Sequence, residues 1–368
     1  MRKAASSMNH LLYAGTYSHP DLFGEDHGPT GRGQGIYALT FDDRSGVLRQ
    51  ARVYEGILNP AYLALSADGR RLFCIHELDT YRGAMGGGVS SYAIQRDGAL
   101  RQLSSKPTYG GFPCHVAVGP DGGLLSIANY GGGSLCVYSV DEDGALHTPQ
   151  VFAHRGEGPN RERQEAPHVH SSLFTPSGSH VIAMDLGIDA LMAYPVEGET
   201  VQQETAYTVA VKPGDGPRMA AYHKAHNLLY VVCELSSQVA TLACDAEGAP
   251  THWVGTVSTL PSGNLVPSTA ADISLSPDGM FCYASNRGHD SLSVFRVDDQ
   301  GGLTMVQNIP CGGRTPRAFT LDPTGSWLLC ANQDSDTVTV FAVDQVEGTL
   351  TPQGELALPS PVCLVFEP

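Results

Sequence analysis

The chain has 368 residues, of which 42% are hydrophobic and only 16% are charged, and it contains 42 glycines and 24 prolines. This mixture favours many short strands joined by tight turns over long exposed helices. The formal net charge of −16 disfavours nonspecific binding to nucleic acid or to an anionic membrane surface, and no apolar stretch approaches the length of a membrane span.

The cysteines indicate a reducing compartment. There are nine of them, an odd number, with no CxxC pair, and several lie inside apolar runs, as Cys136, Cys282 and Cys330 do. This pattern is typical of buried free thiols. The apolar run at residues 11–14 is too short for the core of a signal peptide. We therefore expect a cytoplasmic protein.

One segment shape, a short apolar run that ends in one or two polar residues, recurs along the whole chain. In chain order the copies are LLYAGTY from Leu11, LFCIHEL from Leu72, LLSIANY from Leu124, VIAMDLG from Val181, LYVVCEL from Leu229, FCYASNR from Phe281 and LLCANQD from Leu328. Most copies follow a strand that ends in a turn such as SPDG, and most precede an alternating strand such as SLCVYSVD. The seven copies lie about fifty residues apart, the spacing of four-stranded propeller blades. The sequence therefore predicts an all-β fold, a seven-bladed β-propeller with four-stranded blades.

The C-terminal segment matches the strand that the first repeat copy lacks. The first copy, at Leu11, lacks the turn strand that precedes most others, while SPVCLVFEP from Ser360 matches TPRAFTLDP from Thr315 position for position. The C-terminus is thus expected to supply the innermost strand of the blade that begins at Leu11, which closes the ring and leaves no open sheet edge. We expect residues 1–9 to form a flexible N-terminus and residues 10–368 to form one propeller domain.

An insertion at residues 18–34, with His19, Asp21, Asp26 and His27, interrupts the repeat in the first blade. Two interpretations remain open for it: a lid over one mouth of the channel, or an ordinary mobile loop.

Two repeat positions should face one mouth of the central channel, because the first and second strands of each blade run antiparallel. The start of strand one carries Cys114, His170, Arg218, Ala271 and Arg317, and the end of strand two carries Glu77, Tyr130, Leu186, Glu234, Arg287 and Gln333. The scaffold positions repeat, whereas these positions diverge. Cations and a carboxylate gathered in a concavity are suited to binding a small anion.

Longer motifs give the chain a family resemblance. They are RQEAPHVHS from Arg163, GPRM from Gly216, CEL around Glu234, SNRGHDSLSVF from Ser285, and TPRAF followed by ANQ near the end. With them the whole chain resembles the lactonase-type seven-bladed propellers, which include one form of 6-phosphogluconolactonase and the fungal carboxy-muconate lactonizing enzyme.

The resemblance implies a catalytic site made of His170, Arg218, Glu234 and Arg287. The chain departs from the family pattern twice: Cys233 stands where members often have Asn, and Met219 stands where they often have His.

Each catalytic candidate also has a structural interpretation. His170 is either a general acid or base, since histidine titrates near neutral pH, or a polar residue lining the channel. His168, two residues earlier, would face the same side of a strand; no obvious third ligand accompanies the two histidines, so we predict no metal. Arg218 and Glu234 should be cross-strand neighbours, either as a structural ion pair or with Glu234 orienting Arg218 toward a carboxylate or phosphate.

Four further residues are candidates for substrate binding: Arg163, His168, Arg317 and Asn286. Arg163 lies in a charged loop, a setting that is more often solvated, and Arg317 could instead brace the next blade. Asn286 recurs with Asn129 and Asn332 at one repeat position, and recurrence favours a structural role in a turn.

Three functions fit these observations. The first is hydrolysis of a small anionic sugar lactone, such as 6-phosphogluconolactone, by arginines that hold the anion and polarise the carbonyl while His170 or Glu234 activates water. No cofactor is required. The second is a muconate-type lactonizing reaction, in which Arg218 and Arg287 grip two carboxylates. The third is a scaffold for protein partners, because a propeller fold alone does not imply catalysis.

Overall fold

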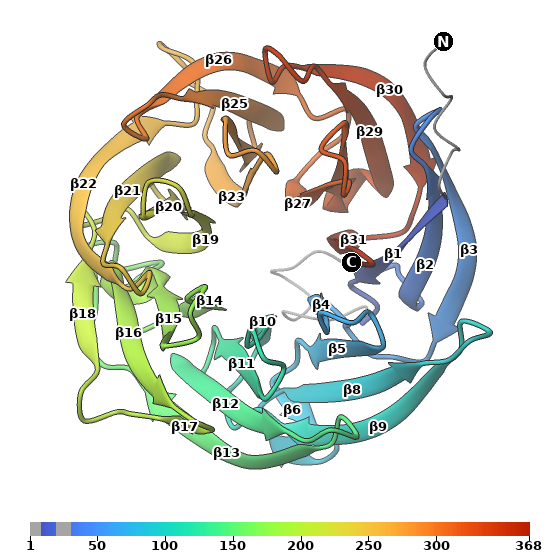
Figure 1. Cartoon of the computed structure of the whole chain (residues 1–368), viewed down its shortest axis with the longest axis vertical. Coiled ribbons are helices and arrows are strands. Elements are labelled where there is room, and N and C mark those ends of the chain that lie inside the picture. Colours follow the sequence, from blue (N-terminus) through green and yellow to red (C-terminus); the bar gives the residue numbers. More distant parts are fainter. Residues whose placement is uncertain (1–8, 20–30) are drawn as a thin grey trace.

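The computed structural model describes residues 9–19 and 31–368, and these form seven β-sheet blades around a central axis (Figure 1). In each blade the strands run antiparallel, and the first strand lies nearest the axis. The only helical elements of the described residues are two 3-10 turns, η1 (Leu186–Ile188) and η2 (Gln333–Ser335). The structure confirms the predicted all-β propeller.

Each blade runs from an innermost strand at the axis to an outer strand at the rim. The first contains β31 (Pro361–Phe366), β1 (Asn9–Thr16), β2 (Gly35–Asp42) and β3 (Val47–Glu55); the second β4 (Leu63–Leu65), β5 (Arg71–His76), β8 (Gly88–Ile94) and β9 (Leu100–Pro107); the third β10 (Pro113–Val118), β11 (Leu124–Asn129), β12 (Ser134–Val140) and β13 (Leu146–Ala153). The fourth contains β14 (Val169–Phe174), β15 (His180–Asp185), β16 (Ala190–Glu197) and β18 (Tyr207–Ala210), with β17 (Thr200–Val201) also paired to β16. The fifth contains β19 (Pro217–His223), β20 (Leu228–Cys233), β21 (Gln238–Cys244) and β22 (Pro250–Ser258). The sixth contains β23 (Thr269–Leu275), β24 (Phe281–Arg287), β25 (Ser291–Val297) and β26 (Leu303–Pro310); the seventh β27 (Pro316–Leu321), β28 (Trp327–Asn332), β29 (Thr337–Val343) and β30 (Leu350–Ala357). A small hairpin, β6 (Thr80–Tyr81) and β7 (Ala84–Met85), lies between β5 and β8 in the chain and forms a separate two-stranded sheet.

The ring closes as the repeat predicted. Strand β31 pairs antiparallel with β1, with Leu12 opposite Phe366 and Ala14 opposite Leu364. The pairing continues beyond β1, where the Tyr17 N–H donates to the Ser360 carbonyl over 3.1 Å. Residues 1–8 and 20–30 lie outside the described residues, and with them lie most of the expected flexible N-terminus and the centre of the 18–34 insertion. Asn9 begins β1.

The blades pack face to face through alternating apolar side chains. Between the second and third blades, for example, Phe73 and Ile75 of β5 share a buried cluster with Leu125 and Ile127 of β11. The turns between first and second strands hold glycine at positive φ, as at Gly279 (+75°) in the Pro-Asp-Gly turn, a conformation that residues with a Cβ disfavour. The scaffold thus follows from strand alternation and turn chemistry.

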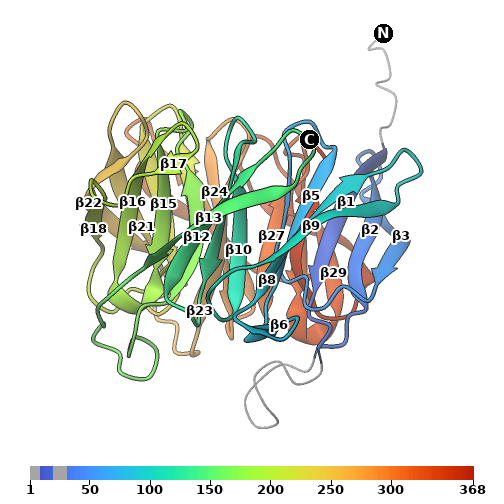
Figure 2. The ribbon, with the colours of Figure 1, turned by 90° about the horizontal axis from the view of Figure 1, so that it is seen from below.

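This geometry brings the diverged repeat positions together. The starts of the first strands and the ends of the second strands lie at the same end of every blade, because each pair is an antiparallel hairpin. That end carries the β6–β7 hairpin and lies opposite the C-terminus (Figure 2).

Candidate active site

A cavity of about 360 Å³ opens at the predicted mouth of the channel. Its lining residues are Glu77, Phe112, Cys114, Tyr130, Gly131, Arg163, His170, Glu234, Arg287 and Arg317. All of them except Phe112, Gly131 and Arg163 occupy one of the two diverged repeat positions. The repeat therefore predicted most of this cavity.

Glu234 is the centre of the charge cluster on one wall. Its carboxylate lies 2.7 Å from Arg287 Nη2, 3.0 Å from Arg218 Nε and 2.5 Å from Arg163 Nη2, and its side chain is only 4% exposed. Burial by itself would raise the pKa of Glu234, but the guanidinium groups of Arg287 and Arg218 outweigh it and hold the pKa well below its usual value. Glu234 is therefore a permanent anion near neutral pH.

Three arginines against one carboxylate leave this wall with excess positive charge. Arg218 lies deeper than Arg287, beside a small hollow that also contacts Tyr62 and Asp272, and one of its Nη1 hydrogens is donated to the Ala271 carbonyl. Burial and the neighbouring Arg287 lower the pKa of Arg218 to about 10, which still leaves it protonated at pH 7. The buried Nε of Arg287 has no hydrogen-bond acceptor within the described residues. Such a wall can accept a further anion.

His170 stands next to this cluster as a buried imidazole. Its Nε2 lies 3.9 Å from a Glu234 oxygen, and its ring meets the Tyr130 ring edge-on at 5.5 Å. Burial, followed by the charge of Arg218, holds the pKa of His170 well below its usual value. The ring is therefore neutral at pH 7 and can exchange hydrogen bonds without carrying charge.

The opposite wall carries a second carboxylate. Glu77 accepts a hydrogen bond from the Tyr17 hydroxyl at 3.1 Å, and Arg317 Nη2 lies 4.0 Å from its other oxygen. The guanidinium of Arg317 also covers the Tyr17 ring at 5.2 Å. The sequence placed Glu77 at the mouth without assigning it to the site, and Tyr17 was missed. The only sequence signal for Tyr17 is its place at the end of the first repeat copy.

The matches to known proteins agree with this geometry. Residues 11–366 match the family described as lactonase, 7-bladed beta-propeller. The chain belongs to this family.

Individual relatives cover almost the whole chain. A 6-phosphogluconolactonase from Bacillus subtilis is 34% identical over 97% of this chain and 98% of its own length. Two solved structures are similar. The structure of a periplasmic gluconolactonase from Pseudomonas aeruginosa has a TM-score of 0.88 and 32% identity, and the match covers 98% of this chain and 99% of that chain. The structure of a putative 6-phosphogluconolactonase from Bacteroides fragilis has a TM-score of 0.86 and 30% identity, and the match covers 100% of this chain and 99% of that chain. The protein is thus a member of a family of lactone-hydrolysing enzymes.

The two departures from the family pattern are each next in sequence to a member of the charge cluster. Met219 contacts the deep hollow beside Arg218, and Cys233 is fully buried one residue before Glu234. Burial raises the pKa of the Cys233 thiol well above its usual value, so this side chain is a neutral apolar filler.

Arg163 reaches the cavity from the segment before β14. The neighbouring Gln164 is fully buried, and its amide donates to the Leu186 carbonyl at 2.9 Å and to the Asp189 carboxylate at 2.8 Å. The base of the same segment is fixed by His154, whose Nδ1 lies 2.7 Å from Asp185. These buried contacts hold the segment so that Arg163 reaches Glu234, although the Arg163 side chain remains 39% exposed.

His168 does not line the cavity. Its ring stacks on Tyr130 at 4.5 Å, and its nitrogens lie 3.1 Å from the Tyr130 carbonyl and from Glu165. The two histidines were expected to face one side of a strand, but His168 precedes β14 and the register shifts between Val169 and Ser171. The described residues include no group of three or more His, Cys, Asp or Glu side chains that could hold a metal ion.

Asn286, expected to bind substrate, does not line the cavity, and its side chain makes structural contacts. The side chain is fully buried and donates to the Thr259 carbonyl and to Ser291, each at 3.1 Å. Asn129 makes the equivalent bonds to Thr108 and Ser134. The repeated asparagine therefore ties the second strand of a blade to its outer strands, which is the alternative that its recurrence favoured.

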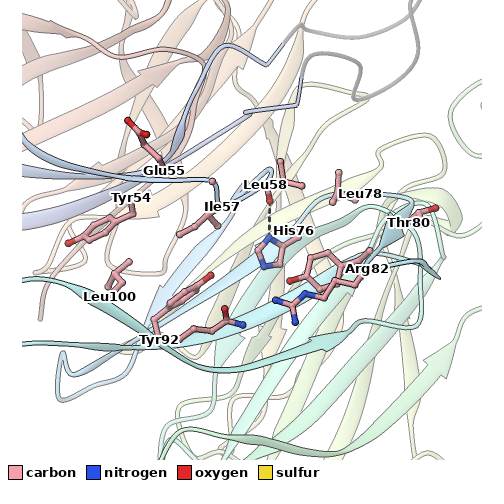
Figure 3. A pocket seen from close by; sticks show the side chains of 13 residues that line it. Tyr54, Glu55, Ile57, Leu58, His76, Leu78, Thr80, Arg82, Tyr92 and Leu100 are labelled. Carbon is pink, nitrogen blue, oxygen red and sulfur yellow. Dashed lines mark hydrogen bonds between the residues drawn. The ribbon is translucent and has the colours of Figure 1, made fainter.

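Larger hollows lie on the flank of the ring and lack such a cluster. One of about 650 Å³ lies beside β3, β5 and β8, with Tyr54, Leu58, His76 and Tyr92 among its lining (Figure 3). The Nδ1 of His76 lies 2.8 Å from the Leu58 carbonyl, and its Nε2 lies 2.8 Å from Ser90, so both ring nitrogens have partners. Glu55 and Arg82 stand on opposite sides of this hollow (Figure 3). Size alone does not mark the site; converging charge does.

Proposed function

We propose that this protein hydrolyses the ring ester of a small anionic sugar lactone, and that a 6-phosphogluconolactone-like compound is its substrate. The observation that carries the proposal is the convergence of Arg163, Arg218 and Arg287 on the single carboxylate Glu234 in a 360 Å³ cavity. This wall is positive although the whole chain has a net charge of −16. A small positive cavity in an otherwise acidic protein is suited to binding a small anion. A large acidic partner would be repelled by the rest of the surface.

The arginines would bind the anion and act on the carbonyl. Arg287 and Arg163 line the cavity itself, where a guanidinium fork can hold a phosphate or carboxylate bidentately. When water attacks the lactone carbonyl, negative charge develops on its oxygen, and a desolvated guanidinium stabilises that charge more than it stabilises the neutral ester. Glu234 holds the three guanidinium groups in place as their counter-ion.

The sequence left open whether His170 or Glu234 activates water, and the electrostatics favour neither as a strong base. Glu234 is held ionised by three cations, and the pKa of His170 is held well below its usual value by burial and Arg218. A neutral His170 is suited to orienting the water or the carbonyl by a hydrogen bond.

The muconate-type alternative is less well supported. It needs two separated grips for two carboxylates, yet Arg218 and Arg287 both contact the same oxygen of Glu234, at 3.0 and 2.7 Å. The two guanidinium groups therefore form one grip.

A panel of lactones tests the proposal. Acid release would be followed in a pH-stat, with EDTA present and with buffer alone as the control for spontaneous hydrolysis. We expect 6-phosphogluconolactone to be hydrolysed with a kcat/KM about tenfold or more above that of unphosphorylated gluconolactone, since one charge-assisted contact contributes roughly 1.5–3 kcal/mol. Muconolactone should be a poor substrate. Equal rates for the phosphorylated and neutral sugars would remove the phosphate from the proposal, and no hydrolysis of any lactone would overturn it.

We also propose that the protein works in the cytoplasm. All nine cysteines lie in the described part of the chain and are free, eight of them buried, which suits a reducing compartment. Within the described residues no helix is long and apolar enough to cross a membrane. Because one relative of known structure is named a periplasmic enzyme, cell fractionation is the deciding measurement.

A further inference from the structure

The cavity contains two carboxylates at equivalent places in the repeat. Glu77 directly follows the second strand of its blade, as Glu234 does, and the two side chains are similarly buried, at 5% and 4% exposure. Both line the same 360 Å³ cavity. A substrate in this cavity would therefore lie within reach of both.

Their surroundings differ sharply. Three guanidinium groups lie within 3.0 Å of the Glu234 carboxylate, whereas the nearest cation to Glu77 is Arg317, at 4.0 Å. The groups that face Glu77 come from several elements: Tyr17 from the segment after β1, Arg317 from β27, the Cys114 thiol from β10 and, at longer range, Arg218 from β19. Only the Tyr17 hydroxyl donates a hydrogen bond to its carboxylate among the described residues. Glu77 thus has free acceptor capacity on the cavity side.

The two carboxylates consequently differ in basicity. Burial raises the pKa of Glu77 above its ordinary value, and Arg317 and the Tyr17 hydrogen bond offset only part of that effect. The arginines shift Glu234 in the opposite direction. A pair of carboxylates whose environments separate their pKa values is a common arrangement for dividing acid–base and electrostatic roles.

Asp272 is a third acid nearby, and it is differently engaged. It contacts the small deep hollow rather than the main cavity, and its two oxygens accept the backbone N–H groups of Ile273 at 2.9 Å and Phe319 at 3.0 Å. Burial raises its pKa to about 6. Asp272 is therefore the matched control for any titration assigned to Glu77.

We infer that Glu77 is the general base and then the general acid of the lactone hydrolysis, with Tyr17 as its positioning residue. This inference rests on the proposed function. A water molecule gives one proton to the Glu77 carboxylate as its oxygen forms a bond to the lactone carbonyl carbon. The ring C–O bond then breaks, and the departing ring oxygen takes the proton from the Glu77 carboxylic acid to become a hydroxyl. The new carboxylic acid of the product releases its proton to solvent, so the enzyme returns to its starting state.

The test is the pH dependence of kcat for 6-phosphogluconolactone. The wild type is compared with Glu77→Gln, Glu77→Asp, Tyr17→Phe and Asp272→Asn, and a thermal melt is recorded for each. We expect the wild-type kcat to fall as pH falls, because the base becomes protonated. Glu77→Gln should lower kcat by about 100-fold or more with a smaller change in KM. Its residual activity should not fall at low pH, so the acidic limb of the pH profile should be absent. Glu77→Asp should recover part of the loss.

Tyr17→Phe gives a readout that a purely structural role would not produce. It removes a hydrogen bond that favours the ionised carboxylate, so the acidic limb should move to higher pH. Asp272→Asn should leave the limb in place. If Glu77→Gln does not fold, the shift in Tyr17→Phe decides the question by itself.

Several outcomes would overturn the inference. The first is a Glu77→Gln enzyme with the wild-type kcat and the wild-type acidic limb in its pH profile. The second is a Tyr17→Phe enzyme whose acidic limb does not move. The third is an Asp272→Asn enzyme whose acidic limb is absent. If the wild type is active and any of these results is found, only the role of Glu77 is refuted and the proposed function stands. A wild type that hydrolyses no lactone refutes the proposed function together with it.

Discussion

The two walls of the cavity show how one repeated scaffold yields two kinds of site. Glu77 and Glu234 occupy the same position in the second and fifth blades, with nearly the same burial. The Glu234 wall gathers three cations within 3.0 Å, and the Glu77 wall provides one cation at 4.0 Å and one hydroxyl. Position in the repeat therefore decides where a carboxylate lies, and the side chains of neighbouring blades decide what it can do.

The walls also differ in how they are assembled. The residues around Glu234 come from the segment before β14 and from β19 and β24, which follow one another along the chain. Those around Glu77 come from both ends: Tyr17 follows β1, and Arg317 lies on β27, whose neighbour in the ring is β31. The Glu77 wall thus depends on ring closure, and this difference can be tested.

The largest effect should come from deleting residues 361–368. The deletion removes β31, exposes the inner edge of the first blade and takes away the buried side chains Val362, Leu364 and Phe366, each contributing about 1.5–3 kcal/mol. We expect a severely lowered melting temperature or no cooperative unfolding, measured by circular dichroism. A truncated protein that melts like the full chain would contradict closure by this strand.

Removing the charge of either glutamate compares the two walls directly. Glu234→Gln leaves the buried Arg218, the half-buried Arg287 and the partly exposed Arg163 without their counter-ion. It should lower the free energy of unfolding at pH 7 by about 3–5 kcal/mol, mostly through Arg218. Glu77→Gln should cost less, because the ionised form of Glu77 is disfavoured by burial. Equilibrium urea unfolding measures both.

The pH dependence of these two effects has opposite signs. The folded-state pKa of Glu234 is lowered, so its stabilisation is present above its unfolded pKa and is lost only as pH falls through the lower folded value. The folded-state pKa of Glu77 is raised, so its contribution is fully present below its unfolded pKa and is lost as pH rises through the folded value. Equal losses for both variants at pH 7, with the same pH trend, would show that the walls do not differ.

Truncating the arginines should act on substrate binding. Arg287→Ala is expected to raise KM for an anionic lactone about tenfold or more, because Arg287 lines the cavity and its loss removes a charge-assisted contact of roughly 1.5–3 kcal/mol. Arg218→Ala should raise KM by less, because Arg218 lies in the deeper hollow and acts through Glu234. Arg296→Ala is the matched control: Arg296 lies on β25, one strand outward from Arg287, with an exposed partner in Glu347. Wild-type kinetics for both arginine variants would mean that this wall does not hold the anion.

The smallest of these effects should follow from His170→Ala. A neutral imidazole that orients water contributes through hydrogen bonds, so kcat should fall by more than KM rises. The acidic limb of the pH profile should survive, since Glu77 rather than His170 is the inferred base. A mutant with normal kcat would leave His170 as a residue that merely lines the channel.

The sequence by itself determined the scaffold. Seven copies of one strand, the Pro-Asp-Gly turns and the match between the two ends predicted the blades, their strand order and the closure by β31, because strand alternation and turn conformation are local properties. The same alignment brought Glu77, His170, Glu234 and Arg287 to one mouth, since the ends of antiparallel strands have a fixed place in each blade.

Only the tertiary structure decided what these residues are for. Arg163 is far from Glu234 in sequence. It contacts Glu234 because the buried hydrogen bonds of the neighbouring Gln164 fix the segment that carries Arg163. His168 and Asn286, both expected at the substrate, have their polar atoms bonded within the protein. Arg317 comes within 4.0 Å of Glu77 because closure of the ring by β31 brings the seventh blade near the second. A pKa and a hydrogen-bond partner depend on distances between blades, and no periodicity along one chain encodes those distances.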